Sequence, residues 1–249
     1  MWVEFQSELV LYGRLDSEAG DDSVCSIAFN DSIQYKSITP YPFDTFMSRD
    51  TLYYSSDAGP NVVSRGHSAL FDTMLACLFT GPALHLSFHK NSQSYEVTHN
   101  KEDCESGEYT RLDLPYALGI FFADAWIASV TQGSRWAGVK TIPRYSGMGH
   151  RPAIRIQTRI VQVKDSIATA VLSSDTTLSN MPTILPNGES ATIIQNTIHL
   201  GGTLFLAQES GIPLRGEIRI EESMQIIRPK LSDRAIEKEC AYILRFRIY

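Results

Sequence analysis

The sequence has few features of a secreted or membrane protein. Only four of its 249 residues are cysteines, none of them in a Cys-x-x-Cys pair or at zinc-ligand spacing, which is typical of reduced thiols in a cytoplasm. Glu4 and Glu8 stand where a secretory signal would be basic and then apolar. The longest apolar run, 114–130, is short for a membrane span and contains Asp124. We therefore expect a cytoplasmic protein without a membrane segment, in which this run is part of the core.

The motifs of common enzymes are also missing. The pair Gly201-Gly202 has no following Lys-Ser/Thr, which excludes a P-loop, and the segment 188–192 lacks the second glycine of a nucleophile elbow. His85, His89 and His99 have no carboxylate or cysteine at ligand spacing, so we favour ordinary histidines over a metal trio. The sequence predicts no catalytic residue, no metal and no cofactor.

Charge is distributed unevenly along the chain. Residues 1–124 carry 7 Lys and Arg against 18 Asp and Glu, whereas residues 125–249 carry 15 against 10. The segment 100–109 holds four acids and predicts an exposed loop. We expect a single domain over 1–249, with this loop joining an acidic part, 1–99, to a basic part, 110–249. A basic part of this kind favours a polyanion or an acidic neighbour as its partner.

Hydrophobic periodicity predicts a mixture of strands and a helix. Residues 2–15, 24–33 and 84–89 read as extended, and 68–79 has the apolar spacing of a helix that Gly81-Pro82 ends. In the second half, apolar and polar residues alternate over 152–163, over 215–226 (interrupted by Glu222) and over 244–248, as half-buried strands require. These three strands are predicted to present arginines on the face opposite their apolar residues, namely Arg151, Arg155, Arg159, Arg215, Arg219, Arg245 and Arg247.

Two interpretations of these arginines compete. They form either a solvated sheet face, paired with Glu217 or Glu221, or a groove that neutralises phosphates. The segment 135–159 favours the groove, because it has six Lys and Arg, no acid and interleaved aromatic residues. The RNA-binding residues predicted in and around it, with Trp136 or Tyr145 stacking on a base, are Arg135, Trp136, Lys140, Arg144, Tyr145, His150, Arg151, Arg155 and Arg159.

A family resemblance rests on the segment 189–222. Residues 191–199 read as a short helix, Gly201 and Gly202 follow, and 211–220 runs through a glycine-containing turn into an alternating strand. This order resembles the end of the ferredoxin-like RAMP proteins of CRISPR systems, and more specifically the subunit that caps the 5′ end of the guide RNA in type IV complexes. The helix at 68–76 and the run 114–129 are similar to the same group. The positions at the family's glycine-rich loop are Gly201, Gly202, Gly211 and Gly216, although 203–209 is apolar and acidic where the family is basic.

The resemblance implies an α+β fold, with a ferredoxin-like (RAMP or RRM-like) antiparallel sheet core and β-rich insertions. It implies a non-catalytic crRNA-binding subunit of a multi-subunit ribonucleoprotein for antiviral defence. Its partners would be the guide RNA and other CRISPR effector subunits in a hetero-oligomer. RNA cleavage with His150 as general base is not expected, because no second acid or base lies nearby in the sequence.

Two alternatives come from other classes. Residues 198–204, Ile-His-Leu-Gly-Gly-Thr-Leu, resemble the start of the helix in hotdog-fold acyl-CoA thioesterases and dehydratases, with 224–229 as part of the following meander. Strand-rich character without motifs is also typical of a structural subunit of a virion or secretion assembly.

Overall fold

A computed structural model describes residues 2–18, 24–40, 49–55, 84–89, 94–98, 119–122, 130–142, 151–184, 189–228 and 236–248. Side chains are described from residue 119 onward, apart from 236 and 238. The predicted helix at 68–79 and the acidic loop at 100–109 lie outside these ranges, as does the glycine-proline pair at 81–82.

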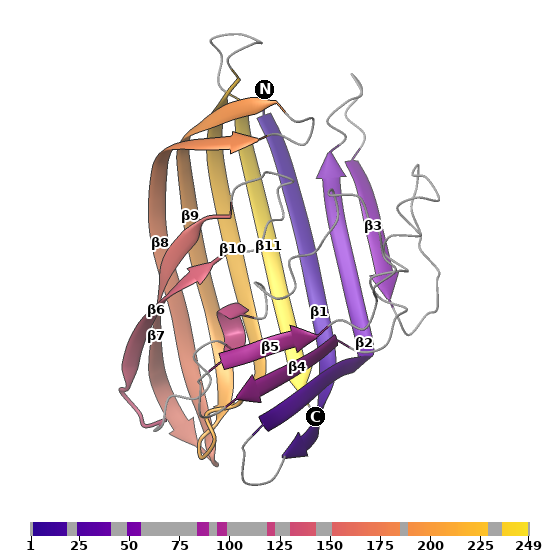
Figure 1. Cartoon of the computed structure of the whole chain (residues 1–249), viewed down its shortest axis with the longest axis vertical. Coiled ribbons are helices and arrows are strands. Elements are labelled where there is room, and N and C mark those ends of the chain that lie inside the picture. The colour runs from indigo at the N-terminus through magenta and orange to yellow at the C-terminus, as the bar shows by residue number, and fades with distance from the viewer. Residues whose placement is uncertain are drawn as a thin grey trace.

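The described part of the chain is built from eleven strands in one sheet (Figure 1). Their order across the sheet is β5-β4-β2-β1-β11-β10-β9-β8-β7-β6, with β3 beside β2. All neighbours are antiparallel except β1 and β11, which run parallel. The strands are β1 (Trp2–Glu18), β2 (Val24–Pro40), β3 (Arg49–Ser55), β4 (Leu84–His89), β5 (Ser94–Thr98), β6 (Arg135–Thr141), β7 (Ala153–Lys164), β8 (Ile167–Ile184), β9 (Ser190–Ala207), β10 (Pro213–Ile227) and β11 (Ile236–Ile248).

Strands β6 to β11 form an antiparallel meander in which each strand pairs with the next in the sequence. Asp165 and Ser166, both with positive φ, make the tight turn between β7 and β8, as hairpin turns of this length require. The turn 208–212, with Gly211 at φ +70°, joins β9 to β10. The predicted antiparallel sheet is therefore present, but helix is scarce in the described ranges, with 119–122 helical.

The predicted helix at 191–199 is wrong, because these residues lie in the first half of β9. Five of the nine are threonine or isoleucine, whose branched side chains favour the extended backbone. Ala191, Ile193 and Ile198 are buried, and pairing with β8 and β10 satisfies the backbone on both sides. Of the four glycines assigned to a glycine-rich loop, Gly201 and Gly202 continue β9 and Gly216 lies in β10, whereas Gly211 lies in the turn after β9.

The alternation predicted in the second half is confirmed. Side chains at every second position are buried in β7 up to Ile160, in β10 from Gly216 onward and in the described part of β11, and the arginines between them point to the opposite face. The short helix 119–122 packs on the buried face, where Phe121 and Phe122 have ring centroids 4.6 and 5.0 Å from that of Phe246. The run 114–130 is therefore part of the core where it is described, with Ile120 and Val130 also buried.

The interruption at Glu222 in this buried face is confirmed, and its partner lies on the neighbouring strand. Glu222 is 8% exposed, and the Asn196 side-chain amide donates a hydrogen bond of 2.7 Å to Glu222 Oε1. A carboxylate among apolar side chains requires such donors, because burial without them is unfavourable. Asn196 is itself 1% exposed.

Candidate nucleic-acid interface

The face of β6 to β11 that points away from the buried core is called the outer face. Strand register brings side chains from all six strands into rows that cross it. One such row runs from Arg135 through Arg159, Val171, Thr203 and Glu217 to Arg245. The outer face collects seven arginines from four strands: Arg135, Arg155, Arg159, Arg215, Arg219, Arg245 and Arg247.

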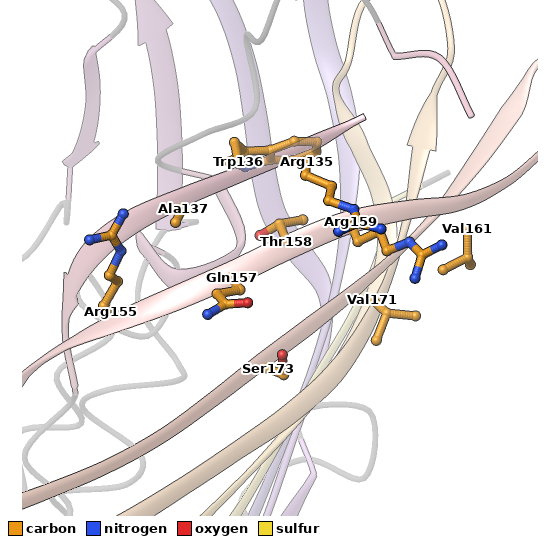
Figure 2. Close-up of a pocket in the computed structure, with 10 residues that line it drawn as sticks. All are labelled: Arg135, Trp136, Ala137, Arg155, Gln157, Thr158, Arg159, Val161, Val171 and Ser173. Carbon is orange, nitrogen blue, oxygen red and sulfur yellow. The ribbon is translucent and has the colours of Figure 1, made fainter. Parts of the chain in front are cut away.

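The first of two hollows on this face lies over β6, β7 and β8 and has a volume of about 550 Å³. Figure 2 shows Arg135 and Arg159 side by side on β6 and β7, with Arg155 farther along β7 and Ser173 on β8. Val161 and Val171 add apolar surface and are 41% and 40% exposed. We call this the β6–β8 hollow; it joins guanidinium groups to exposed apolar side chains.

Arginines face each other directly in two places. Arg135 is the register partner of Arg159, and Arg215 is the register partner of Arg247. Like charges directly opposite each other destabilise an antiparallel pair. An anionic ligand would relieve the repulsion between Arg135 and Arg159.

The second hollow lies over β9, β10 and β11 and has a volume of about 600 Å³. We call it the β9–β11 hollow. The guanidinium of Arg215 lies over the Phe205 ring, with its central carbon 3.9 Å from the ring centroid. Arg245 Nε donates a 2.8 Å hydrogen bond to Glu217, and the groups are 39% and 55% exposed. The full lining is Gly201, Gly202, Thr203, Phe205, Arg215, Gly216, Glu217, Arg219, Arg245, Phe246 and Arg247.

Acidic side chains are concentrated toward the other end of the outer face. Asp175 Oδ1 lies 2.5 Å from His199 Nδ1, and Glu221 Oε1 lies 2.6 Å from Arg219 Nη2. Glu237 and Glu239 lie farther along β11 in the same direction. The face is therefore electrostatically polarised, with both hollows in its basic end.

The structure brings together four of the predicted RNA-binding residues at the β6–β8 hollow, namely Arg135, Trp136, Arg155 and Arg159. Trp136 is half-buried and packs against the core, and Lys140 lies on the same side of β6, opposite buried Ile154. Arg151 precedes β7 and is half-exposed. The remaining predicted residues, Arg144, Tyr145 and His150, lie outside the described ranges.

The predicted glycines separate according to their surroundings. Gly201 is on the outer face, Gly211 is in the turn after β9, and Gly202 and Gly216 point toward packed neighbours. The hotdog alternative expected a helix beginning near 198–204, but this segment lies within β9. The helix on which that resemblance rests is therefore a strand in the structure.

Sequence reasoning missed the β9–β11 hollow because its residues come from three strands. Phe205 and Thr203 were not predicted as site residues, because 204–206 is Leu-Phe-Leu and has no alternation of apolar and polar residues that would separate the two sides of a strand. Their meeting with Arg215 and Arg245 depends on strand register, which periodicity within one segment does not give.

Within the described residues, no helix is long and apolar enough to cross a membrane, and no three His, Cys, Asp or Glu side chains are grouped to hold a metal ion. Comparison of the chain with protein-family models, with curated proteins and with solved structures found no match.

Proposed function

We propose that the protein binds single-stranded nucleic acid, with RNA as the expected form, on the basic end of the outer face. The observation that carries the proposal is the gathering of seven arginines around two hollows of one sheet face. Arginine neutralises phosphates and offers a planar group on which a base can stack.

The spacing of the arginines supports an extended strand as the ligand. Neighbouring β-strands are about 4.8 Å apart, so the row from Arg159 on β7 to Arg245 on β11 spans about 19 Å. That length accommodates several nucleotides crossing the sheet. Val161, Val171 and Phe205 are apolar surfaces near the arginines, and bases of a single strand are free to contact such surfaces.

A purely solvated face is the competing interpretation, and part of the face fits it. Arg219 and Arg245 are paired with Glu221 and Glu217, and exposed pairs of this kind contribute little to stability. Across the described residues, however, Arg135, Arg155 and Arg159 have no carboxylate within ion-pair distance. A cluster of like charge without a carboxylate partner among the described residues is better explained by an anionic ligand than by stabilisation of the sheet.

A more specific form of the proposal is the one that the sequence resemblance implies, a non-catalytic subunit that holds guide RNA in a CRISPR ribonucleoprotein. The support for it is the basic second half of the chain and the arginines of β7. The ferredoxin-like core implied by the same resemblance stays a prediction; the two fully described connections in the meander, 165–166 and 208–212, are turns and add no support. Co-purification of a uniform short RNA from the native host is the result expected for this form.

Fluorescence anisotropy with a labelled 20-nucleotide single-stranded RNA tests the proposal. Arg135→Gln/Arg159→Gln removes two positive charges from the β6–β8 hollow. We expect this double variant to bind about tenfold or more weakly at moderate salt, because a protein that neutralises fewer phosphates binds RNA with lower affinity.

A matched control separates position from net charge. Ser179→Glu/Gln225→Glu makes the same change of two charges with exposed residues at the acidic end of the outer face. We expect a much smaller loss of affinity for the control. Equal reductions in the two variants would show that the β6–β8 hollow is no interface, and absence of RNA binding by the unmodified protein would overturn the proposal.

A further inference from the structure

Gly201 differs from the other glycines of the β9–β11 hollow, because the packing around it does not require a residue without a side chain. A Cβ at Gly202 would lie 2.6 Å from the backbone oxygen of Glu217, and one at Gly216 would lie 2.5 Å from Leu204 Cδ2 and 2.6 Å from Phe246 Cε1. A Cβ at Gly201 would have no atom within 4 Å. Packing therefore requires glycine at 202 and 216, and leaves position 201 open.

The backbone does not require glycine at position 201 either. Among the described glycines, positive φ values occur at Gly133 and Gly211, and Gly201 continues the regular pairing of β9. Glycine inside a strand is destabilising relative to other residues, and it often marks a place where a ligand approaches the backbone closely.

The surroundings of Gly201 indicate the chemistry of such a ligand. Its register partners are Ser173 on β8 and Arg219 on β10, and Thr203 is the next outward residue on β9. Farther into the hollow, the Arg215 guanidinium is held over the Phe205 ring. The result is a flat, side-chain-free patch of backbone bordered by hydroxyl groups and a planar cation.

We propose that Gly201 is the floor of a subsite for one nucleotide, with the base lying flat against the exposed backbone. Arg219 borders the base, and Arg245 and Arg247 contact the adjacent phosphate. On binding, Arg219 and Arg245 leave their ion pairs with Glu221 and Glu217 and contact the ligand. Breaking these exposed pairs costs little free energy, because such pairs are weak. The inference rests on the proposed function and identifies where on the outer face a base is held.

The test fills the patch without changing charge. Gly201→Val places a β-branched side chain on the floor of the hollow, where it has space and suits the strand. We expect unchanged or higher resistance to urea, together with about tenfold or more weaker binding of the 20-nucleotide RNA, the reduction expected when a base is displaced from the surface it packs on. Gly201→Ala, a smaller change at the same site, is expected to weaken binding less.

Ser223→Val is the matched control, because it adds a valine at an exposed outward position of β10 near the acidic end. It should bind as the unmodified protein does. If the unmodified protein binds RNA and Gly201→Val binds equally well, the subsite is refuted while the proposed function stands. If the unmodified protein does not bind RNA, both are refuted.

Discussion

At the scale of single residues, two glycines that line the same hollow differ in whether their surroundings leave room for a side chain. Gly216 lies in β10 against Leu204, Phe246 and Phe121, whereas Gly201 faces open space. The three glycines at 201, 202 and 216 therefore do not form one motif, although they are close in the sequence. Substitution of each glycine by alanine is therefore expected to change the free energy of unfolding differently.

Gly216→Ala is expected to lower the free energy of unfolding by about 1–3 kcal/mol, because the new methyl group overpacks the core. Gly201→Ala is expected to leave it unchanged or to raise it by about 0.5–1 kcal/mol. Urea unfolding followed by circular dichroism measures both. Equal destabilisation by the two substitutions would contradict the different surroundings described for these glycines.

The buried pair of Asn196 and Glu222 is a second feature at this scale. Asn196→Ala removes a donor to Glu222 Oε1 and should destabilise the protein by about 1–3 kcal/mol, because a buried carboxylate loses one of its hydrogen bonds. Gln225→Ala, a change at an exposed position of the strand that carries Glu222, is the comparison and should cost little. Urea midpoints that coincide for the two variants would argue against a structural role for the pair.

At the scale of elements, β6 and β7 combine a proposed RNA-binding role with the repulsion between Arg135 and Arg159. Arg159→Glu converts the directly opposed pair with Arg135 from like to opposite charge. We expect it to stabilise the fold by about 0.2–1 kcal/mol and to weaken RNA binding. Thermal unfolding and anisotropy measured on the same preparation check the two effects; a variant that is less stable and binds normally would contradict both.

The elements also show what the sequence could predict. Alternation of apolar and polar residues identified β7, β10 and β11 and the face on which Arg155, Arg215 and Arg245 lie, because a strand repeats every two residues. The helix predicted at 191–199 is wrong because apolar residues in a short window fit either period, and pairing with β8 and β10 decided the outcome. Contacts between strands, such as Asn196 with Glu222, required the register.

At the scale of the whole molecule, the net charge of −6 hides a basic end of the outer face. The seven arginines there come from β6, β7, β10 and β11, so folding concentrates charge that the sequence spreads over 113 positions, from 135 to 247. On a protein of net negative charge, a basic face favours binding of a polyanion in one orientation, because the net charge of the remaining residues repels the same ligand.

If the proposed function holds, the salt dependence of RNA binding measures how many phosphates this face neutralises. For a single strand, the logarithm of the binding constant falls with the logarithm of salt concentration by about 0.7 for each phosphate contacted. Roughly three to five neutralised phosphates predict a slope of about −2 to −3.5. Anisotropy titrations across a salt series give the slope, and Arg135→Gln/Arg159→Gln should reduce its magnitude by about 1.4; an unchanged slope would exclude these arginines as phosphate ligands.

Photo-crosslinking to a single-stranded RNA that carries 4-thiouridine, followed by mass spectrometry of the linked peptides, tests most directly whether the outer face is the nucleic-acid interface. The account predicts crosslinks in peptides from β7, β9, β10 and β11, at outward residues near Arg159, Gly201 and Arg215. Crosslinks confined to residues 1–124, or to the acidic end of β10 and β11, would contradict it.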